Sequence, residues 1–466
     1  MNDLCWWPVD PLIKVFEDAT PPEAAGPVVI EAARGETASG QAVLFSPTIH
    51  LMGARLEATP LVPEAGGSAA ELAPPQLRFV GFVPVRQNTR GTPEEHLVRA
   101  APALFPDPLL DHPSLHLRKG RAQPIWITVE VPPDARPGRY RGRVGIRTRD
   151  GQVSGIDCLL DVHAARVPAG RRLRVTNWFS LSAIARYHGL EQFSEPFWEM
   201  LDRYARLMGE HRQNTVITPL FQLIRPYPDG DRIALDFSRF DRYVSLFERH
   251  GVAALIEGGH LGGRRGGWNE GFSLTIWELT DGTVRTARVA PESAEADRFL
   301  AWFLPSLRTH LAARGWEARY VQHLADEPVD ANAESYNQLV RAVRRHWPTL
   351  KLIEATMCQT IEPLDIWVPI LNAWHRAADF YRSQREMGRE VWFYTCLGPT
   401  GTYANRLIDY PTLKVRLLHW LNAHYGAAGY LHWGLNYWDG VASPFSDVEP
   451  AHGRDLTLPP GDCGIV

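Results

Sequence analysis

The periodicity of hydrophobic and polar positions changes near residue 168 and divides the chain into two parts. Before it, short apolar runs alternate with polar positions at a period of two and are separated by Pro, Gly and Asp, as in strands joined by turns. Residues 124–131 and 140–147 alternate most regularly, and with residues 132–138 between them they predict a hairpin with a long loop. Further strands are expected at 28–32, 41–44, 77–83 and 158–162. We therefore predict an N-terminal β-sandwich domain at residues 1–168.

Beyond residue 168, strand-like runs alternate with amphipathic stretches of helical period. The expected strands lie at 173–179, 215–220, 253–257, 320–324, 351–355, 365–368, 391–395 and 429–433. The expected helices lie at 197–208, 237–250, 294–313, 333–347, 376–388 and 413–425. This alternation predicts a (β/α)8 barrel at residues 169–466. A doubly wound open sheet is the alternative, although no Gly-rich dinucleotide-binding turn follows the first strand.

Two irregularities interrupt the predicted barrel. A long insertion at residues 258–291 follows the third strand and contains a probable hairpin around Asp281-Gly282. Because such loops lie on the catalytic face of a barrel, the insertion is expected to form a lid or the wall of a binding subsite. After the eighth strand only a polar loop runs to Val466, so the barrel is expected to lack its closing C-terminal helix.

The composition of the chain indicates which partners and which cellular location to expect. The net charge of −4 gives no electrostatic reason to expect nucleic acid or anionic lipid as a partner. No segment reaches the roughly 18 consecutive apolar residues of a membrane span. The five scattered cysteines and a start without a basic stretch followed by an apolar one predict a cytoplasmic location. The sequence makes no prediction about oligomeric state.

The strongest candidate chemistry is the pair Asp326-Glu327, which follows the expected strand ending near Leu324 and precedes Pro328. The carboxyl ends of barrel strands carry the catalytic residues. Adjacent side chains on an extended backbone point in different directions, so the two carboxyl groups could face different parts of one sugar. The alternative is a capping role, because acidic residues commonly precede a helix such as the one expected near Ala333. The local sequence leaves both interpretations open.

Several segments, in this order along nearly the whole chain, resemble glycoside hydrolase family 123, the β-N-acetylgalactosaminidases, and a larger group related to them. They lie at 123–129, 137–142, 323–328, 391–396, 405–411 and 429–438. The resemblance implies an exo-acting retaining hydrolase of terminal β-linked N-acetylhexosamine, specifically N-acetylgalactosamine. Family members usually continue past the position of Val466 into a helical segment.

The resemblance also implies substrate-assisted catalysis, in which the 2-acetamido oxygen of the sugar attacks the anomeric carbon and no protein nucleophile is needed. Glu327 matches the general acid/base, and Asp326 matches the residue that orients the acetamide group. We expect Asp326 to stay ionised, and its charge to raise the pKa of Glu327 so that the glutamate holds a proton near neutral pH.

Polar and aromatic residues near the other strand ends complete the predicted substrate site. Tyr394 is expected to donate a hydrogen bond to the acetamide oxygen, and Asn436 to bind a sugar hydroxyl. Trp433 and Trp438 are candidates for the floor of the sugar pocket, because indole faces stack on sugars. The remaining candidates are Asn177, Trp178, His260 and Trp374. Each of these residues has a structural alternative, since most of the sixteen tryptophans are expected to pack in cores.

No metal or cofactor is expected. The HExxH motif is absent, and His419 and His424 do not share a helix face at a spacing of five. Cys396 is assigned to core packing.

Two alternatives stay open. Glu257 or Glu354 could be a protein nucleophile, which would have to lie about 5 Å from the acid. The chain could also be an inactive carbohydrate-binding protein. Substrates without a 2-acetamido group distinguish the two catalytic mechanisms.

Overall fold

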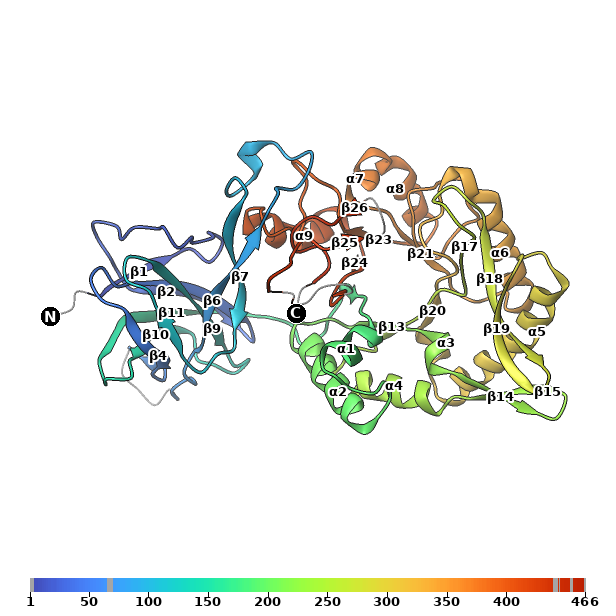
Figure 1. Ribbon diagram of the computed structural model, residues 1–466, viewed down its shortest axis with the longest axis horizontal. Coiled ribbons are helices and arrows are strands. Elements are labelled where there is room, and N and C mark those ends of the chain that lie inside the picture. Colours follow the sequence, from blue (N-terminus) through green and yellow to red (C-terminus); the bar gives the residue numbers. More distant parts are fainter. Residues whose placement is uncertain (1–3, 65–69, 439–442, 444, 453–455, 465–466) are drawn as a thin grey trace. The chain divides into compact units, whose positions relative to one another are not determined.

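A computed structural model describes residues 4–64, 70–438, 443, 445–452 and 456–464 of the chain (Figure 1). The residues form two compact units. The first comprises residues 1–170, 406–415 and 440–461, and the second comprises residues 171–405, 416–439 and 462–466. Residues 406–415 and 440–461 thus belong with the N-terminal unit, although in sequence they follow strands of the second unit.

The first unit is mostly β, as predicted. One sheet has the order β1 (Cys5–Val9), β3 (Thr37–Phe45), β9 (Ala122–Glu130), β6 (Gln76–Val85) and β7 (Ala103–Leu110). The other has the order β2 (Val28–Arg34), β11 (Val153–Arg166), β10 (Gly138–Arg147), β4 (Leu51–Ala58) and β8 (Leu115–Leu117), with β5 (Val62–Pro63) paired to β10. Two short strands, β25 (Ala451–His452) and β26 (Leu456–Thr457), form a separate pair.

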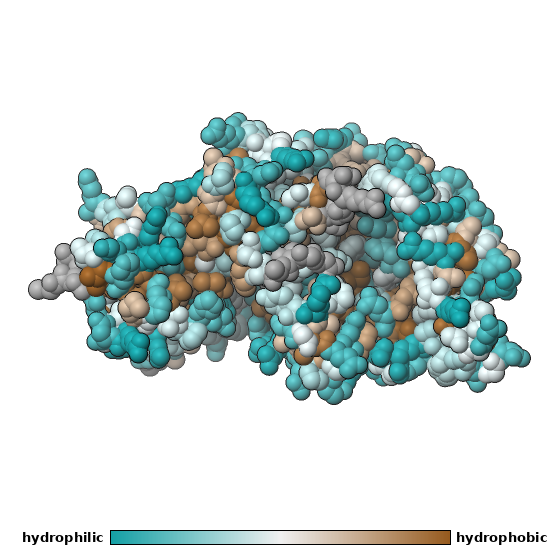
Figure 2. Space-filling view, in the orientation of Figure 1, coloured by the Kyte–Doolittle hydropathy of each residue, from teal (hydrophilic) through white to brown (hydrophobic). Residues whose placement is uncertain are grey.

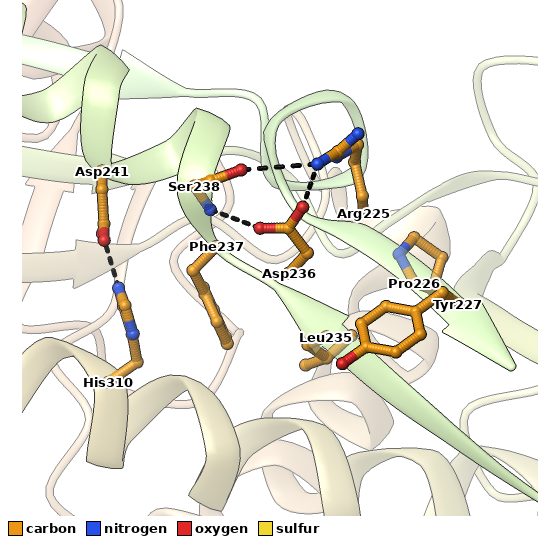
Figure 3. A pocket seen from close by; sticks show the side chains of 9 residues that line it. All are labelled: Arg225, Pro226, Tyr227, Leu235, Asp236, Phe237, Ser238, Asp241 and His310. Carbon is orange, nitrogen blue, oxygen red and sulfur yellow. Dashed lines mark hydrogen bonds and ion pairs between the residues drawn. The ribbon is translucent and has the colours of Figure 1, made fainter. Parts of the chain in front are cut away.

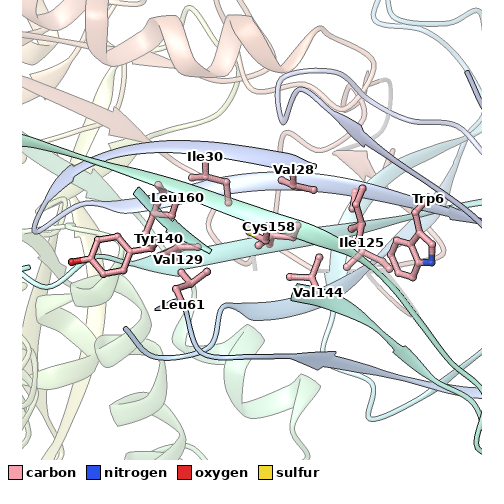
Figure 4. Close-up of a cluster of buried hydrophobic side chains, with 14 of the residues drawn as sticks. Trp6, Val28, Ile30, Leu61, Ile125, Val129, Tyr140, Val144, Cys158 and Leu160 are labelled. Atoms are coloured by element: carbon pink, nitrogen blue, oxygen red, sulfur yellow. The ribbon is translucent and has the colours of Figure 1, made fainter. Parts of the chain in front are cut away.

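One large hydrophobic cluster takes side chains from both sheets (Figure 4). Val28 and Ile30 of β2 are buried while Val29 between them is exposed, which is the alternation that a sheet with one apolar face requires. Ile125 of β9 and Val144 of β10 enter the same core from opposite sheets. The burial of these faces therefore holds the two sheets together.

The predicted hairpin between residues 124–131 and 140–147 is wrong. Both strands exist, but β9 pairs with β3 and β6, whereas β10 pairs with β11, β4 and β5. Both strands have one apolar face, and the long connection lets the chain cross from one sheet to the other. The apolar faces then meet in the core, and no pairing between the two strands is needed.

The second unit contains the eight predicted strands, all in parallel sheets. One sheet has the order β12 (Arg174–Asn177), β24 (Gly429–His432), β23 (Glu390–Thr395), β22 (Ile366–Val368) and β21 (Ile353–Ala355). The other has the order β13 (Thr215–Thr218), β16 (Leu255–Gly258) and β20 (Tyr320–Gln322). A parallel bridge between Gln322 and Leu352 lies between β20 and β21.

The predicted helices are also present, and Figure 1 shows the helices of this unit outside the parallel strands. They are α2 (Glu195–Glu210), α4 (Ser238–Arg249), α5 (Ala294–Ala313), α6 (Ala333–His346), α8 (Ala378–Glu386) and α9 (Thr412–Tyr425), with shorter helices α1 (Leu181–Tyr187), α3 (Leu220–Leu223) and α7 (Leu371–Arg376). The apolar faces of α2, α4, α5 and α6 are buried, whereas α9 exposes Leu413, Leu417 and Trp420. The Ser293 hydroxyl caps α5 by accepting from Ala296 N at 3.1 Å. No helix in the described ranges is long and apolar enough to cross a membrane. Polar residues dominate the visible surface (Figure 2).

The insertion after β16 forms a three-stranded antiparallel sheet of β17 (Gly262–Arg264), β18 (Phe272–Thr280) and β19 (Thr283–Val289). The hairpin predicted around Asp281-Gly282 is confirmed, because Thr280 pairs with Thr283 across that dipeptide. Asp281 and Gly282 have φ angles of 50° and 69°, which the tight two-residue turn requires. A second hairpin, β14 (Arg225–Asp229) and β15 (Arg232–Asp236), was not predicted.

Candidate active site

Asp326 and Glu327 lie just beyond the carboxyl end of β20, in the second unit. Glu327 has a φ angle of 49°, in the left-handed region that residues other than glycine rarely adopt. Arg264 of the insertion donates a hydrogen bond to the backbone carbonyl of Glu327 and thereby supports this conformation. Such backbone strain is concentrated at functional sites in proteins.

The carboxyl group of Glu327 accepts a hydrogen bond at Oε1 from the hydroxyl group of Tyr394, on β23. Burial, and then the charge of Asp326, raise the pKa of Glu327 to about 7, although the Tyr394 hydrogen bond and Arg264 act in the opposite direction. The second oxygen, Oε2, is therefore the one that can carry a proton near neutral pH. Tyr394 reaches the site as predicted, but its hydroxyl lies on Glu327, and its contact with an acetamide oxygen stays a prediction.

Asp326 keeps 49% of its side chain exposed, with Oδ1 lying 3.9 Å from Nε2 of His260. Partial burial, together with the charge of Glu354, raises the pKa of Asp326, while His260, His323 and Arg264 lower it. Two carboxyl groups this close titrate as a pair. The burial of Tyr437, and then the charge of Asp326, raise the pKa of that tyrosine, so Tyr437 also belongs to this site.

A buried ionic cluster lies beside the pair, centred on Glu354 of β21. Glu354 Oε1 lies 3.2 Å from His260 Nε2 and 3.0 Å from His323 Nδ1. Burial alone would raise the pKa of Glu354, but the two histidines outweigh it and lower this pKa to about 2. Burial alone would lower the pKa of His323, but Glu354 and Glu257 outweigh it and raise this pKa to about 9. The cluster is thus an ion pair of ionised Glu354 with protonated His323.

Trp178 covers this cluster. Its ring meets the rings of His260 and His323 edge to face, with centroids 5.5 and 5.2 Å away. Its Nε1 donates to Glu257 Oε2 at 2.9 Å, and the residue is only 9% exposed. The structure therefore brings the predicted residues Trp178 and His260 together with Asp326.

Three further predicted residues, namely Trp433, Asn436 and Trp438, follow β24 in the chain. Trp433 donates from Nε1 to Asp462 Oδ2 at 3.2 Å, and its ring centroid lies 4.9 Å from that of Tyr437. Trp438 is buried, with its ring centroid 4.7 Å from that of Tyr187. Asn436 is fully buried: its Oδ1 accepts from Ser180 N at 2.7 Å and its Nδ2 donates to Ser180 O at 3.2 Å, so its amide holds the start of α1.

Asn177 and Trp374 have other neighbours. Asn177 Nδ2 donates to Gln213 Oε1 at 3.0 Å. Trp374, on α7, stacks on Phe393 at a centroid distance of 5.7 Å. Because successive residues of a strand face opposite sides, Phe393 lies on the side of β23 opposite to Tyr394. Trp374 therefore packs between helix and sheet, away from the side that carries Tyr394.

One group of residues in the described ranges has the composition of a metal site. The ligand atoms of His260, His323 and Glu354 lie within 4.8 Å of one another. These atoms already bond to each other, and a protonated imidazole offers no lone pair to a cation. The group therefore does not fit a metal ion.

The sequence pointed neither to Arg264 nor to Tyr437 as site residues. Arg264 lies in the insertion, whose Gly-rich start gave only a general expectation of a subsite wall. Tyr437 stands between the candidates Asn436 and Trp438, where strand-end position alone does not show which side chain faces Asp326. Glu354 was considered only as an alternative nucleophile.

A separate hollow of about 820 Å³ lies between the β14–β15 hairpin, the start of α4 and His310 of α5 (Figure 3). Asp236 accepts from the backbone N–H of Ser238 and pairs with Arg225, and these contacts lower the pKa of Asp236. The second carboxylate, Asp241, pairs with His310 at 2.6 Å. Asp236, held in its ionised form by these contacts, does not suit a proton donor at neutral pH, so the carboxyl pair at residues 326–327 is the better candidate for the active site.

Comparison with known proteins agrees with the geometry. The model of the glycoside hydrolase 123 N-terminal domain matches residues 18–148, and that of the catalytic domain matches residues 178–466. A family 123 glycoside hydrolase from Clostridium perfringens, studied for glycolipid glycan hydrolysis, has a similar structure at 17% sequence identity, with a TM-score of 0.77 over 99% of this chain and 82% of that chain.

A β-D-glucuronidase from Dictyoglomus thermophilum matches at 10% identity over 94% of this chain and 64% of that chain, but its structural similarity is low, with a TM-score of 0.34. No curated protein matches the sequence. Because the catalytic-domain model alone covers residues 178–466, more than half of the sequence, the chain belongs to glycoside hydrolase family 123.

Proposed function

We propose that this protein is an exo-acting, retaining hydrolase of terminal β-linked N-acetylhexosamine, with N-acetylgalactosamine as the preferred sugar, and that it uses the 2-acetamido group of the substrate as nucleophile. The observation that carries the proposal is the neighbouring pair of carboxyl groups, in which Glu327 has a pKa of about 7 beside Asp326. We also propose that the eight parallel strands close into a (β/α)8 barrel around this site.

The two carboxyl groups take different roles. Glu327 donates its proton to the glycosidic oxygen as the acetamide oxygen attacks the anomeric carbon and the bond to the leaving group breaks. Asp326, ionised, accepts the acetamide N–H and stabilises the positive charge that spreads over the oxazolinium ion. Glu327 then takes a proton from water, which attacks the anomeric carbon and opens the intermediate. Two displacements at one carbon retain its configuration.

The surroundings of the alternative nucleophiles support this mechanism. The side chains of Glu257 and Glu354 have no exposed surface. Both oxygens of Glu354 accept hydrogen bonds, and Glu257 Oε2 accepts from Trp178. A carboxylate in such a position cannot approach an anomeric carbon without breaking the buried cluster.

The insertion supplies the leaving-group side of the proposed site. Trp268 is 51% exposed, and the Arg264 guanidinium lies 4.0 Å from its ring centroid. The same guanidinium donates to the backbone carbonyl of Glu327, and this contact supports our assignment of Trp268 to the leaving-group side. An exposed indole offers a platform for a sugar ring, so the proposed substrate carries a further sugar in its leaving group. The glycolipid glycan hydrolysis studied in the C. perfringens relative fits such a substrate.

The test is hydrolysis of three p-nitrophenyl β-glycosides, namely the N-acetylgalactosaminide, the N-acetylglucosaminide and the galactoside, with proton NMR of the first-formed anomer. Turnover of acetamido sugars alone, with retention and with loss in Glu327→Gln, is expected. Turnover of the galactoside would contradict the substrate-assisted mechanism. Binding of N-acetylgalactosamine without turnover of any glycoside would identify a carbohydrate-binding protein.

A further inference from the structure

Glu354 is the centre residue of β21, and its side chain has no exposed surface. A buried carboxylate costs several kcal/mol of desolvation free energy unless hydrogen bonds and opposite charge offset that cost. Its oxygens lie within hydrogen-bond distance of groups on Leu324, Ala325, Tyr336, His260 and His323. Three of these residues immediately precede Asp326 in the chain.

The backbone contacts fix the point from which the catalytic turn starts. β20 ends at Gln322, and beyond it the N–H groups of Leu324 and Ala325 donate to Glu354 Oε2 at 2.9 and 3.1 Å. One carboxylate oxygen thus takes the place of a neighbouring strand for the two residues before Asp326. The next two residues carry the catalytic carboxyl groups, and the second has the left-handed φ angle of 49°.

The other carboxylate oxygen of Glu354, Oε1, acts on Asp326 through the side chain of His260. His260 Nε2 lies 3.2 Å from Glu354 Oε1 and 3.9 Å from Asp326 Oδ1, so one nitrogen stands between the two carboxylates. The Glu354 contact restricts the rotation of the His260 ring and keeps this nitrogen 3.9 Å from Asp326 Oδ1. The buried carboxylate therefore controls both the backbone of the pair and the nearest polar neighbour of Asp326.

We infer that Glu354 is a positioning residue for catalysis, which sets the placement of Asp326 and Glu327 through the amides of Leu324 and Ala325 and through His260. This inference rests on the proposed function of the pair. A role in stability alone would require only that the buried charge be paired, which His323 already achieves.

Two substitutions distinguish the effect of the Glu354 charge from the effect of the distance between its carboxylate and the two amides. Glu354→Asp keeps the charge for His323 but withdraws the carboxylate from the two amides by one methylene group. Glu354→Gln keeps the reach and removes the charge. Glu449→Asp is the matched control, because Glu449 is also buried and its carboxylate also accepts from two successive backbone amides, those of Arg86 and Gln87, in the first unit.

The measurements are kcat and KM per folded enzyme on p-nitrophenyl N-acetyl-β-galactosaminide, and affinity for the sugar-derived thiazoline, which mimics the oxazoline intermediate. Glu354→Asp should lower kcat and thiazoline affinity between about tenfold and 100-fold with little change in KM, since a displacement near 1 Å has such effects. Glu354→Gln should lower kcat as well, and Glu449→Asp should lower the melting temperature while keeping kcat. Equal kcat in Glu354→Asp and wild type would overturn the inference.

If the wild type turns over none of the glycosides, the proposed function fails, and crystal structures of wild type and Glu354→Asp decide the inference alone. A shift of the backbone at residues 324–327 by more than about 0.5 Å, the tolerance of a catalytic site, supports it. An unchanged backbone overturns it.

Discussion

The hydroxyl group of Tyr394 donates a hydrogen bond to Oε1 of Glu327, although 67 positions separate the two residues in sequence. The bond joins the ends of β23 and β20, and it stabilises the ionised form of the glutamate. Asp326, the neighbour of Glu327 in sequence, has the opposite effect. The pKa of the proposed acid is therefore set by opposing contributions that can be removed one at a time.

Removal of the hydroxyl in Tyr394→Phe should raise the pKa of Glu327 above about 7, because the hydrogen bond that favours its ionised form is lost. The alkaline limb of the kcat/KM profile, where the acid loses its proton, should move to higher pH. The measurement is a pH profile on p-nitrophenyl N-acetyl-β-galactosaminide. Tyr381→Phe, a buried tyrosine of α8 beside Trp367 and Phe380, is the control and should leave the limb in place.

Asp326→Asn should move the same limb in the opposite direction. The charge of Asp326 raises the pKa of Glu327, so its removal lowers that pKa and the rate should fall at a lower pH than in the wild type. The maximal rate should also drop by about 10² to 10³, as expected when an electrostatic stabiliser of the transition state is lost. A limb that moves upward in this variant would contradict the coupling of the two carboxyl groups.

Trp268→Ala should lower kcat/KM for substrates that carry a sugar in the leaving group. For a terminal N-acetylgalactosaminyl disaccharide, kcat/KM should drop by about tenfold, corresponding to the loss of ~1.4 kcal/mol of stacking. For N-acetyl-β-galactosaminyl fluoride, which has no sugar in its leaving group, kcat/KM should stay the same. Trp420→Ala, at a 66% exposed tryptophan of α9, is the control. An equal loss on both substrates would place Trp268 outside the leaving-group subsite.

The buried pair of His323 and Glu354 should make stability depend on pH. Folding raises the pKa of His323 from 6.5 to about 9, so its contribution is complete below pH 6.5 and is lost as the pH rises through about 9. Folding lowers the pKa of Glu354 from 4.5 to about 2, so its contribution is complete above pH 4.5 and is lost as the pH falls towards 2.

The melting temperature of the wild type should therefore fall from pH 7 to about 9, and this fall should be smaller in His323→Gln, which has no group that titrates there. Thermal unfolding followed by circular dichroism at several pH values checks this. Parallel curves for the two proteins would show that His323 is not protonated in the folded state.

Two hairpin predictions had opposite outcomes for a physical reason. Asp281 and Gly282 both adopt positive φ angles in a two-residue turn, and the geometry of this turn brings the flanking strands together as a pair. The seven residues between β9 and β10 impose no such geometry. There the burial of two apolar faces in one core decided the pairing, and a local sequence pattern does not contain that information.

The apolar periodicity along the chain is sufficient to predict the eight strands and the helices between them, because this periodicity is local. The sequence also indicates that Asp326 and Glu327 follow a strand end, although β20 ends at Gln322 and not at the expected Leu324. Which distant groups surround them depends on the tertiary structure: Tyr394, Arg264 and Glu354 come from three different strands, and His260 comes from the loop between β16 and β17. The burial that raises the pKa of Glu327 to about 7 depends on all of these contacts together, and spacing along one chain does not encode it.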